Sequence, residues 1–148
     1  MATQNNFTAR GVLNRVKTSV VVPSFPSLNV ISANMGRSLA RIAFNGQLVN
    51  QIPTGTGLVN APEPFVMATI TIALLRTQPI AAAWFAQIQL DCNIQDATIY
   101  SDTSAFPPIA LQSVVASHMD TGPFDATSAD FQLVLSGAFP VNANMWTL

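Results

Sequence analysis

The sequence predicts a single mostly β domain of the α+β class: a β-sandwich or small β-barrel of about seven strands with one flanking α-helix. First, ten prolines and seven glycines divide the 148 residues into short segments, which favours strands and loops over a helix bundle. Second, several segments are rich in β-branched residues or alternate apolar with polar residues. Third, a single alanine-rich segment has helical spacing. The length is that of one domain with its own core.

The first third of the chain is predicted to be an arm followed by short strands. Residues 1–17 are mostly polar and are expected to form an N-terminal arm that is ordered by contact with neighbouring molecules. Strands are predicted over 19–22 and 28–33, and Pro23 and Pro26 hold the passage between them extended.

A third strand is predicted over 37–44, followed by a turn and a long loop. Strict alternation places two sets of side chains on opposite faces of this strand, namely Ser38, Ala40, Ile42 and Phe44 against Arg37, Leu39, Arg41 and Ala43. Asn45-Gly46 is a strong turn signal. Residues 47–64 contain three prolines and two glycines and show no sustained period. We therefore expect a long irregular loop, and such loops in small domains are usually functional.

The middle of the chain predicts the central strand and the one helix. In 65–76, alternate residues form an apolar face made of Val66, Ala68, Ile70, Ile72 and Leu74. The helix is predicted over 80–90, with Pro79 in its first turn and Thr77 or Gln78 as its cap. Ile80, Trp84 and Ile88 share one helical face. Further strands are predicted over 96–100, 109–119 and 130–139, and the last should turn four side chains to the core: Phe131, Leu133, Leu135 and Phe139.

The scarcity of charge is the most unusual feature of the composition. Only 9% of residues are charged, against roughly 25% in an average soluble chain. Hydrophobic residues make up 49%, and the mean hydropathy is +0.37. No apolar run reaches the roughly 18 residues of a spanning helix, and MATQNNFTARG at the start is not a secretory signal, so membrane residence is not expected. Burial of surface against other subunits accounts better for the missing charge.

Few residues are available for chemistry. The net charge of −1 argues against general nucleic-acid binding, and a single cysteine permits no intrachain disulfide. His118 is expected to be a strand histidine and Cys92 a partly buried structural thiol that follows a helix C-terminus. Asp120, Asp125 and Asp130 are spaced around a turn, where a weak calcium site is the alternative to solvated carboxylates. No catalytic residue, cofactor or metal is predicted, and the protein is not expected to be an enzyme.

Several segments, taken in order, resemble a known family. They are the arm, Phe44-Asn45-Gly46, the glycine-rich 54–57, APEPFVMATITI at 61–72, LLRTQPI at 74–80 and FQLVLSG at 131–137. This order is similar to that of the tail tube proteins of contractile-tailed bacteriophages, over nearly the whole chain. Type VI secretion tube proteins share the same architecture.

The resemblance implies a structural virion protein, assembled in the host cytoplasm. Copies would form homohexameric rings that stack into the tail tube, with the sheets of neighbours joined into one inner barrel, usually with an acidic lumen. DNA would pass through the lumen without sequence-specific binding, and the tail sheath, baseplate hub and tape-measure protein would be partners. The inter-subunit loop 47–63 and the arm would cross subunit boundaries. The predicted interface residues are Arg10, Arg15, Lys17, Asn50, Pro53, Thr54, Gly55, Thr56, Gly57 and Glu63.

Two alternatives remain open from the sequence. A tail terminator, baseplate subunit or secretion-tube relative would have the same fold. A sugar-binding β-sandwich would need exposed aromatic residues near polar loops, for which Tyr100, Trp84 and Trp146 are the candidates. The basic residues of the arm, by contrast, are expected to meet acidic groups on a neighbouring molecule.

Overall fold

The long strand β6 (Phe65–Leu75) lies at the centre of the computed structural model, which describes residues 7–146. It pairs along its whole length with β9 (Asp130–Pro140) and on its other side with β3 (Met35–Asn45). Both neighbours are antiparallel. Its alternation predicted the buried face correctly, because all five residues of that face are buried: Val66, Ala68, Ile70, Ile72 and Leu74.

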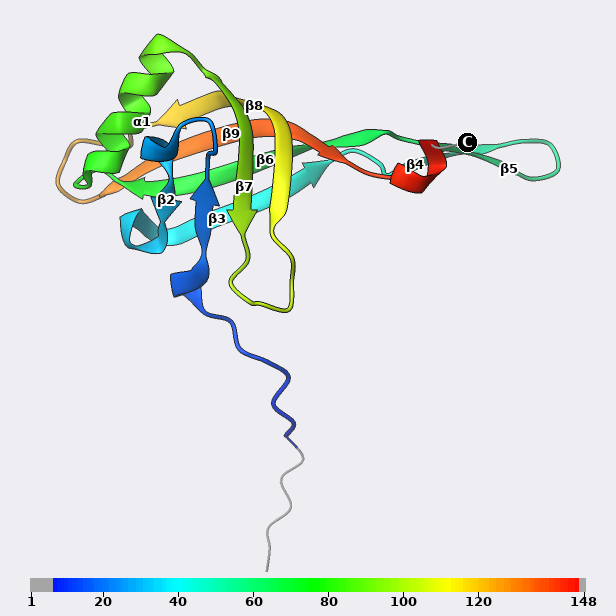
Figure 1. Ribbon diagram of the computed structural model, residues 1–148, viewed down its shortest axis with the longest axis horizontal. Helices are drawn as coiled ribbons and strands as arrows, with labels where there is room; N and C mark the ends of the chain where they lie inside the picture. Colours follow the sequence, from blue (N-terminus) through cyan, green and yellow to red (C-terminus); the bar gives the residue numbers. More distant parts are fainter. Residues whose placement is uncertain (1–6, 147–148) are drawn as a thin grey trace, which may run out of the picture.

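Seven strands form one antiparallel sheet in the order β2-β1-β7-β8-β9-β6-β3. This sheet curls over on itself into a nearly closed barrel, with the core between its two layers (Figure 1). The predicted mostly β class with one flanking helix is therefore confirmed. The remaining strands of the sheet are β1 (Ser19–Val21), β2 (Val30–Ile31), β7 (Asn93–Tyr100) and β8 (Ile109–Asp120).

The predicted strand over 28–33 is wrong for most of its length. Only Val30–Ile31 is a strand, and 3₁₀ helices lie on either side of it, at Pro26–Leu28 and Ser32–Asn34. Pro26 occupies the first position of the earlier 3₁₀ helix, where its fixed φ and missing N–H are tolerated. Local β propensity is overridden here by the turn that this proline begins.

Strict alternation also fails in β3. Leu39 has a left-handed backbone (φ 54°), and the register of β3 against β6 shifts between Met35 and Ala40. The irregularity turns both Leu39 and Ala40 towards the core, against which both pack. Leu39 was predicted on the opposite face from Ala40; a bulge places consecutive residues on one face and corrects that assignment.

The helix α1 (Pro79–Leu90) closes one end of the barrel (Figure 1). Pro79 begins it as predicted, but the Gln78 side chain forms no capping hydrogen bond. Trp84 is fully buried, and its indole Nε1 donates a hydrogen bond of 3.0 Å to the backbone carbonyl of Leu28. The helix is thus joined to the 3₁₀ helix Pro26–Leu28 by both packing and a hydrogen bond.

A β-hairpin extends from the other end of the barrel, where the sequence predicted an irregular loop. Its strands are β4 (Val49–Pro53) and β5 (Leu58–Pro62), which form a separate two-stranded sheet. The prolines obscured it in the sequence. They are tolerated because Pro53 and Pro62 end their strands and because each strand has an outer edge whose N–H groups need no ladder partner.

We predict that Trp84→Ala lowers the free energy of unfolding by about 3–5 kcal/mol, because it leaves a large cavity and an unpaired carbonyl at Leu28. Urea denaturation followed by circular dichroism measures this. Leu90→Ala is the control, since Leu90 is 84% exposed in the same helix, and it should change stability by less than about 0.5 kcal/mol. Equal losses in the two variants would contradict the assigned role of Trp84.

Candidate functional site

The tip of the β4–β5 hairpin is closed by its own polar groups. The Thr54 N–H donates to the Gly57 carbonyl at 2.7 Å, and the Gly57 N–H donates to Thr54 Oγ1 at 3.0 Å. Thr54 Oγ1 in turn donates to the same Gly57 carbonyl at 2.9 Å. The glycine-rich segment 54–57 is therefore a tight hairpin turn whose donors at Thr54 and Gly57 are already used.

The hairpin exposes apolar side chains and carries no charge. Residues 47–62 contain no Asp, Glu, Lys or Arg. Four of their side chains are about half exposed or more: Leu48 (58%), Ile52 (47%), Leu58 (61%) and Val59 (52%). Ile52 lies opposite Val59 in the ladder, so these two share one face. An isolated two-stranded sheet with so little burial is marginally stable in water.

The base of the hairpin is fastened to the barrel by Asn142. Its side-chain Nδ2 donates to the carbonyls of Leu48 (2.8 Å) and Glu63 (2.9 Å), which bridges the two sides of the hairpin. Asn142 has a left-handed backbone (φ 57°), a conformation that asparagine tolerates better than most residues. Next to it, the Val141 N–H donates to the Pro64 carbonyl at 3.1 Å. The end of β9 thereby sets the direction in which the hairpin leaves.

The N-terminal arm leaves the barrel at a different place. From residue 7 to Asn14 the chain has no regular structure, and the 3₁₀ helix Arg15–Lys17 then leads into β1. Figure 1 shows the arm pointing away from the body and away from the hairpin. The structure therefore separates the predicted interface residues into two groups. Arg10, Arg15 and Lys17 are exposed on or beside the arm, and the other seven lie on the hairpin or at its base: Asn50, Pro53, Thr54, Gly55, Thr56, Gly57 and Glu63.

The outer face of strands β3, β6, β9 and β8 is almost uncharged. Register pairing aligns its side chains in rows across the four strands. The three rows nearest the hairpin are Arg41–Thr71–Val134–His118, Ala43–Thr69–Ser136–Val115 and Asn45–Met67–Ala138–Gln112. None of these positions is a carboxylate. The acidic groups of the face, Asp120 and Asp130, lie beyond the rows at the end nearer the helix.

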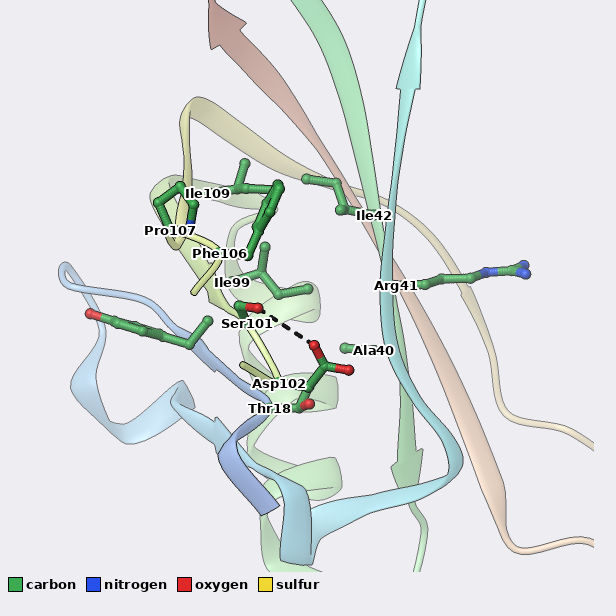
Figure 2. A pocket seen from close by; sticks show the side chains of 11 residues that line it. Thr18, Ala40, Arg41, Ile42, Ile99, Ser101, Asp102, Phe106, Pro107 and Ile109 are labelled. Atoms are coloured by element: carbon green, nitrogen blue, oxygen red, sulfur yellow. Dashed lines mark hydrogen bonds between the residues drawn. The ribbon is translucent and has the colours of Figure 1, made fainter. Parts of the chain in front are cut away.

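A groove lies where the sheet fails to close. Its cavity of about 210 Å³ has β3 on one side and the end of β7 with the following loop on the other. Figure 2 shows Phe106, Ile99, Ile109 and Ile42 gathered around it, with Asp102 below them. A second cavity of about 300 Å³ shares Tyr100, Ser101, Phe106 and Pro107 with the first. We call these two cavities together the seam groove. No sequence motif indicated this groove, because its lining residues come from three separate segments of the chain.

Arg76 organises the loop between β8 and β9, a role that the sequence did not suggest. Its guanidinium donates to the backbone carbonyls of Thr121 (2.7 Å), Pro123 (2.6 Å) and Ser128. It also lies over the ring of Phe124, 5.0 Å from the centroid. An arginine suits this position because its planar fork offers several donors at once.

Two of the three aspartates around this loop accept hydrogen bonds from the loop itself. Asp120 accepts a hydrogen bond from the Gly122 N–H at 2.9 Å. Asp125 accepts two from Thr127, which together lower the pKa of the Asp125 carboxyl below its ordinary value. Among the described residues, no group of three His, Cys, Asp or Glu side chains lies close enough to hold a metal ion. Asp120, Asp125 and Asp130 are therefore not gathered into such a group.

The two candidate reactive residues are both exposed. His118 lies on β8 opposite Val134. Cys92 was predicted to be partly buried, but it is exposed, and its Sγ donates to the Ile88 carbonyl at 3.5 Å. The correction follows from its position just beyond the end of α1, where the chain turns outward before β7.

Of the residues proposed for sugar binding, Trp84 belongs to the core and Tyr100 to the seam groove. The side chain of Trp146 lies outside the described residues. Within residues 7–146, no helix combines the length and the apolar character needed to cross a membrane. A comparison with protein-family models finds no match to this sequence, and a comparison with curated proteins finds none either.

We predict that Arg76→Lys loosens the β8–β9 loop, because a lysine ammonium cannot hold three divergent carbonyls. The free energy of unfolding should fall by about 2 kcal/mol, the scale of a hydrogen bond from a charged group. Amide hydrogen exchange in 121–129 should accelerate, as measured by mass spectrometry. Arg37→Lys, at an exposed position of β3, is the matched control. Unchanged exchange in Arg76→Lys would contradict the assigned role.

Proposed function

We propose that this protein is a structural subunit that assembles with copies of itself into stacked hexameric rings, as the tail tube of a contractile-tailed bacteriophage. The observation that carries the proposal is the uncharged β4–β5 hairpin, which projects from the barrel with its apolar side chains exposed. Neither a catalytic constellation nor a ligand is needed to account for it. The resemblance of the sequence to tail tube proteins gives the proposal its specific form.

The hairpin supports an assembly because its surface is poorly suited to water. Within the described part of the chain, the core and the side chains packed against it do not include Leu48, Ile52, Leu58 or Val59. Exposed apolar surface of this kind marks a site of contact. The bonds from Asn142 fix the hairpin at its base, so it meets a partner already oriented, which reduces the entropy lost on binding. Contact with the adjacent ring is the role proposed for it.

The outer sheet face supports the channel part of the proposal. In a ring, the face of β3, β6, β9 and β8 would line the lumen, through which DNA and the tape-measure protein pass. Its rows of threonine, serine, alanine and valine offer few groups that bind phosphate, so a polyanion would slide past them. Arg41 and His118 are the exceptions. The wall would be close to neutral, where the resemblance implies an acidic lumen.

The remaining parts of the proposal follow from the resemblance. The subunit would be assembled in the host cytoplasm and would lie in the virion, with the tail sheath outside the tube and the baseplate hub at its end. A tail terminator, a baseplate subunit or a type VI secretion tube protein would use the same fold and the same hairpin contact. These three kinds of protein differ in the particle they belong to and in the place of their ring within it. Electron micrographs of the assembled particle therefore distinguish them.

Sugar binding is the second candidate, and one observation favours it. Tyr100 is 43% exposed at the seam groove, beside Ser101, Asp102 and Thr103. An aromatic ring next to hydroxyl and carboxylate groups is a suitable surface for a sugar. A screen of immobilised glycans tests it, and binding that Tyr100→Ala abolishes would support this candidate.

Negative-stain electron microscopy of the purified chain, with mass photometry beside it, tests the main proposal. We expect hollow tubes or six-fold rings, because an uncharged hairpin and an exposed sheet face favour self-association. A chain that stays monomeric at high concentration, even with preformed baseplates as nuclei, would contradict it.

A hairpin variant tests the assigned contact. Replacing 48–62 by a short Asn-Gly turn should leave a folded protein, judged by circular dichroism, that forms monomers or single rings and no long tubes. Ile52→Asp with Val59→Asp should act in the same way, since two carboxylates would be buried in the ring-to-ring contact. Ile52→Val with Val59→Ile keeps the apolar surface and is the control. Tubes of normal length from the charged variant would exclude the hairpin from stacking.

A further inference from the structure

The seam groove and the arm segment 8–13 are two surfaces for which the fold provides no described partner within the chain itself. The arm is fixed at its base, where the Asn14 N–H donates to the Asp102 carbonyl at 2.8 Å. Ser32 Oγ donates a hydrogen bond of 3.2 Å to the Val16 carbonyl and so holds the 3₁₀ helix Arg15–Lys17 in place. Beyond Asn14 the chain heads away from the barrel (Figure 1), with Leu13 73% and Val12 79% exposed.

The groove has the chemistry to receive an apolar segment that carries a cation. Ile99, Ile109 and Phe106 provide an apolar wall, and Phe106 is 57% exposed. The Asp102 carboxylate lies at the same cavity, with a long hydrogen bond of 3.5 Å from Ser101 Oγ. Figure 2 shows that the Arg41 side chain points away from it, to the other side of β3. No described basic side chain forms an ion pair with Asp102, so the groove presents a carboxylate ready to meet a cation.

The backbone around the groove also suits an extended segment. β3 is the last strand of the sheet, and its Ala40–Ile42 stretch forms one side of the cavity. The edge of β3 that faces away from β6 therefore has backbone N–H and C=O groups that a peptide strand can pair with. The arm segment 8–13 is in no helix or strand of its own, so it can adopt that extended conformation without unfolding anything.

We propose that the seam groove binds the arm of a second copy of this chain, with Arg10 pairing with Asp102 and with Val12 and Leu13 against Phe106. This inference rests on the proposed function in one respect: the second copy is taken to be a neighbouring subunit of the same assembly. The arm and the groove are different surfaces of the subunit. Arms passed on in one direction close a ring or extend a filament, whereas two copies that exchange arms close into a dimer. Arg10 lies four residues before Asn14, and four extended residues reach roughly 13 Å. The receiving groove must therefore adjoin the point at which the arm leaves its own barrel.

Charge reversal tests the pairing in the full-length chain. Arg10→Asp and Asp102→Arg are made singly, and self-association of each variant is measured by sedimentation velocity. Each single variant should associate at least about tenfold more weakly than the natural chain, since it sets like charges together at the proposed contact. Asp125→Arg, on the β8–β9 loop, is the control and should have no effect.

Mixing the two single variants in equal amounts should restore association to within about threefold of the natural chain. The reversed arm of the Arg10→Asp chain fits the reversed groove of the Asp102→Arg chain. The unchanged arm of the Asp102→Arg chain fits the unchanged groove of the Arg10→Asp chain. Opposite charges therefore meet at every contact between unlike chains.

The mixture also distinguishes a contact between copies from one within a copy. A double variant that carries both substitutions and associates normally, while the mixture stays weak, would mean that the arm binds its own groove. That result would overturn the proposal. Thermal unfolding within a few degrees of the natural chain confirms that each variant is folded.

The inference and the proposed function can fail separately. Tubes that tolerate both single reversals would overturn the arm contact and leave the tube intact. Association into particles other than rings, with the same charge dependence and the same recovery in the mixture, would support the arm contact and contradict the tube.

Discussion

The pairing of β6 with β9 along eleven residues is the constraint on which the rest of the structure depends. Because directly opposite residues share a face, this ladder turns the Ile70–Leu135 and Ile72–Leu133 pairs to the core and leaves Thr69, Thr71 and their partners outside. Both ends of the ladder also fix a neighbouring element. At one end Val141 and Asn142 hold the base of the hairpin, and at the other Arg76 holds the β8–β9 loop just before the helix begins.

The scarcity of charged residues is matched in the structure by apolar side chains on the surface. The barrel buries one set of them, but the hairpin and the arm bear another set that their own chain leaves largely exposed. Scattered exposed apolar residues are normal on a protein surface. Among the described residues, eight of the nineteen exposed large apolar side chains lie on the arm or the hairpin, and the others are spread over the barrel, the helix and the loops. The two projecting elements are the part of this surface that the proposed assembly would cover.

The hairpin and the arm leave the barrel in different directions (Figure 1). Two contacts of different direction allow an assembly to grow in two ways, around a ring and along an axis. The hairpin is anchored at its base by side-chain hydrogen bonds and has a closed tip, whereas the described arm has no regular structure before Asn14. In the proposed assembly, the hairpin would be a preformed contact and the arm would become ordered on binding.

Local patterns determined much of the fold. The core face of β6, the core residues of β9 and the start of the helix at Pro79 all followed from alternation and helical spacing, which depend only on residues near in sequence. The arm and the segment 47–63 were also identified as candidate interfaces before any tertiary contact was known. Their role stays a prediction, but their exposure agrees with it.

Other features depend on residues that are distant in sequence, and these only the tertiary structure decided. The segment 47–63 became a hairpin because β4 finds β5 and Asn142 fastens its base. Leu39 turned to the core because a bulge against β6 interrupts the alternation. The seam groove joins β3 with the end of β7 and the loop after it, across the place where the sheet stays open. Sequence by itself determined which residues favour strands and which face of a strand is apolar; the closing of the sheet decided which surfaces were left to meet a partner, because that depends on which strands pair and which edge remains unpaired.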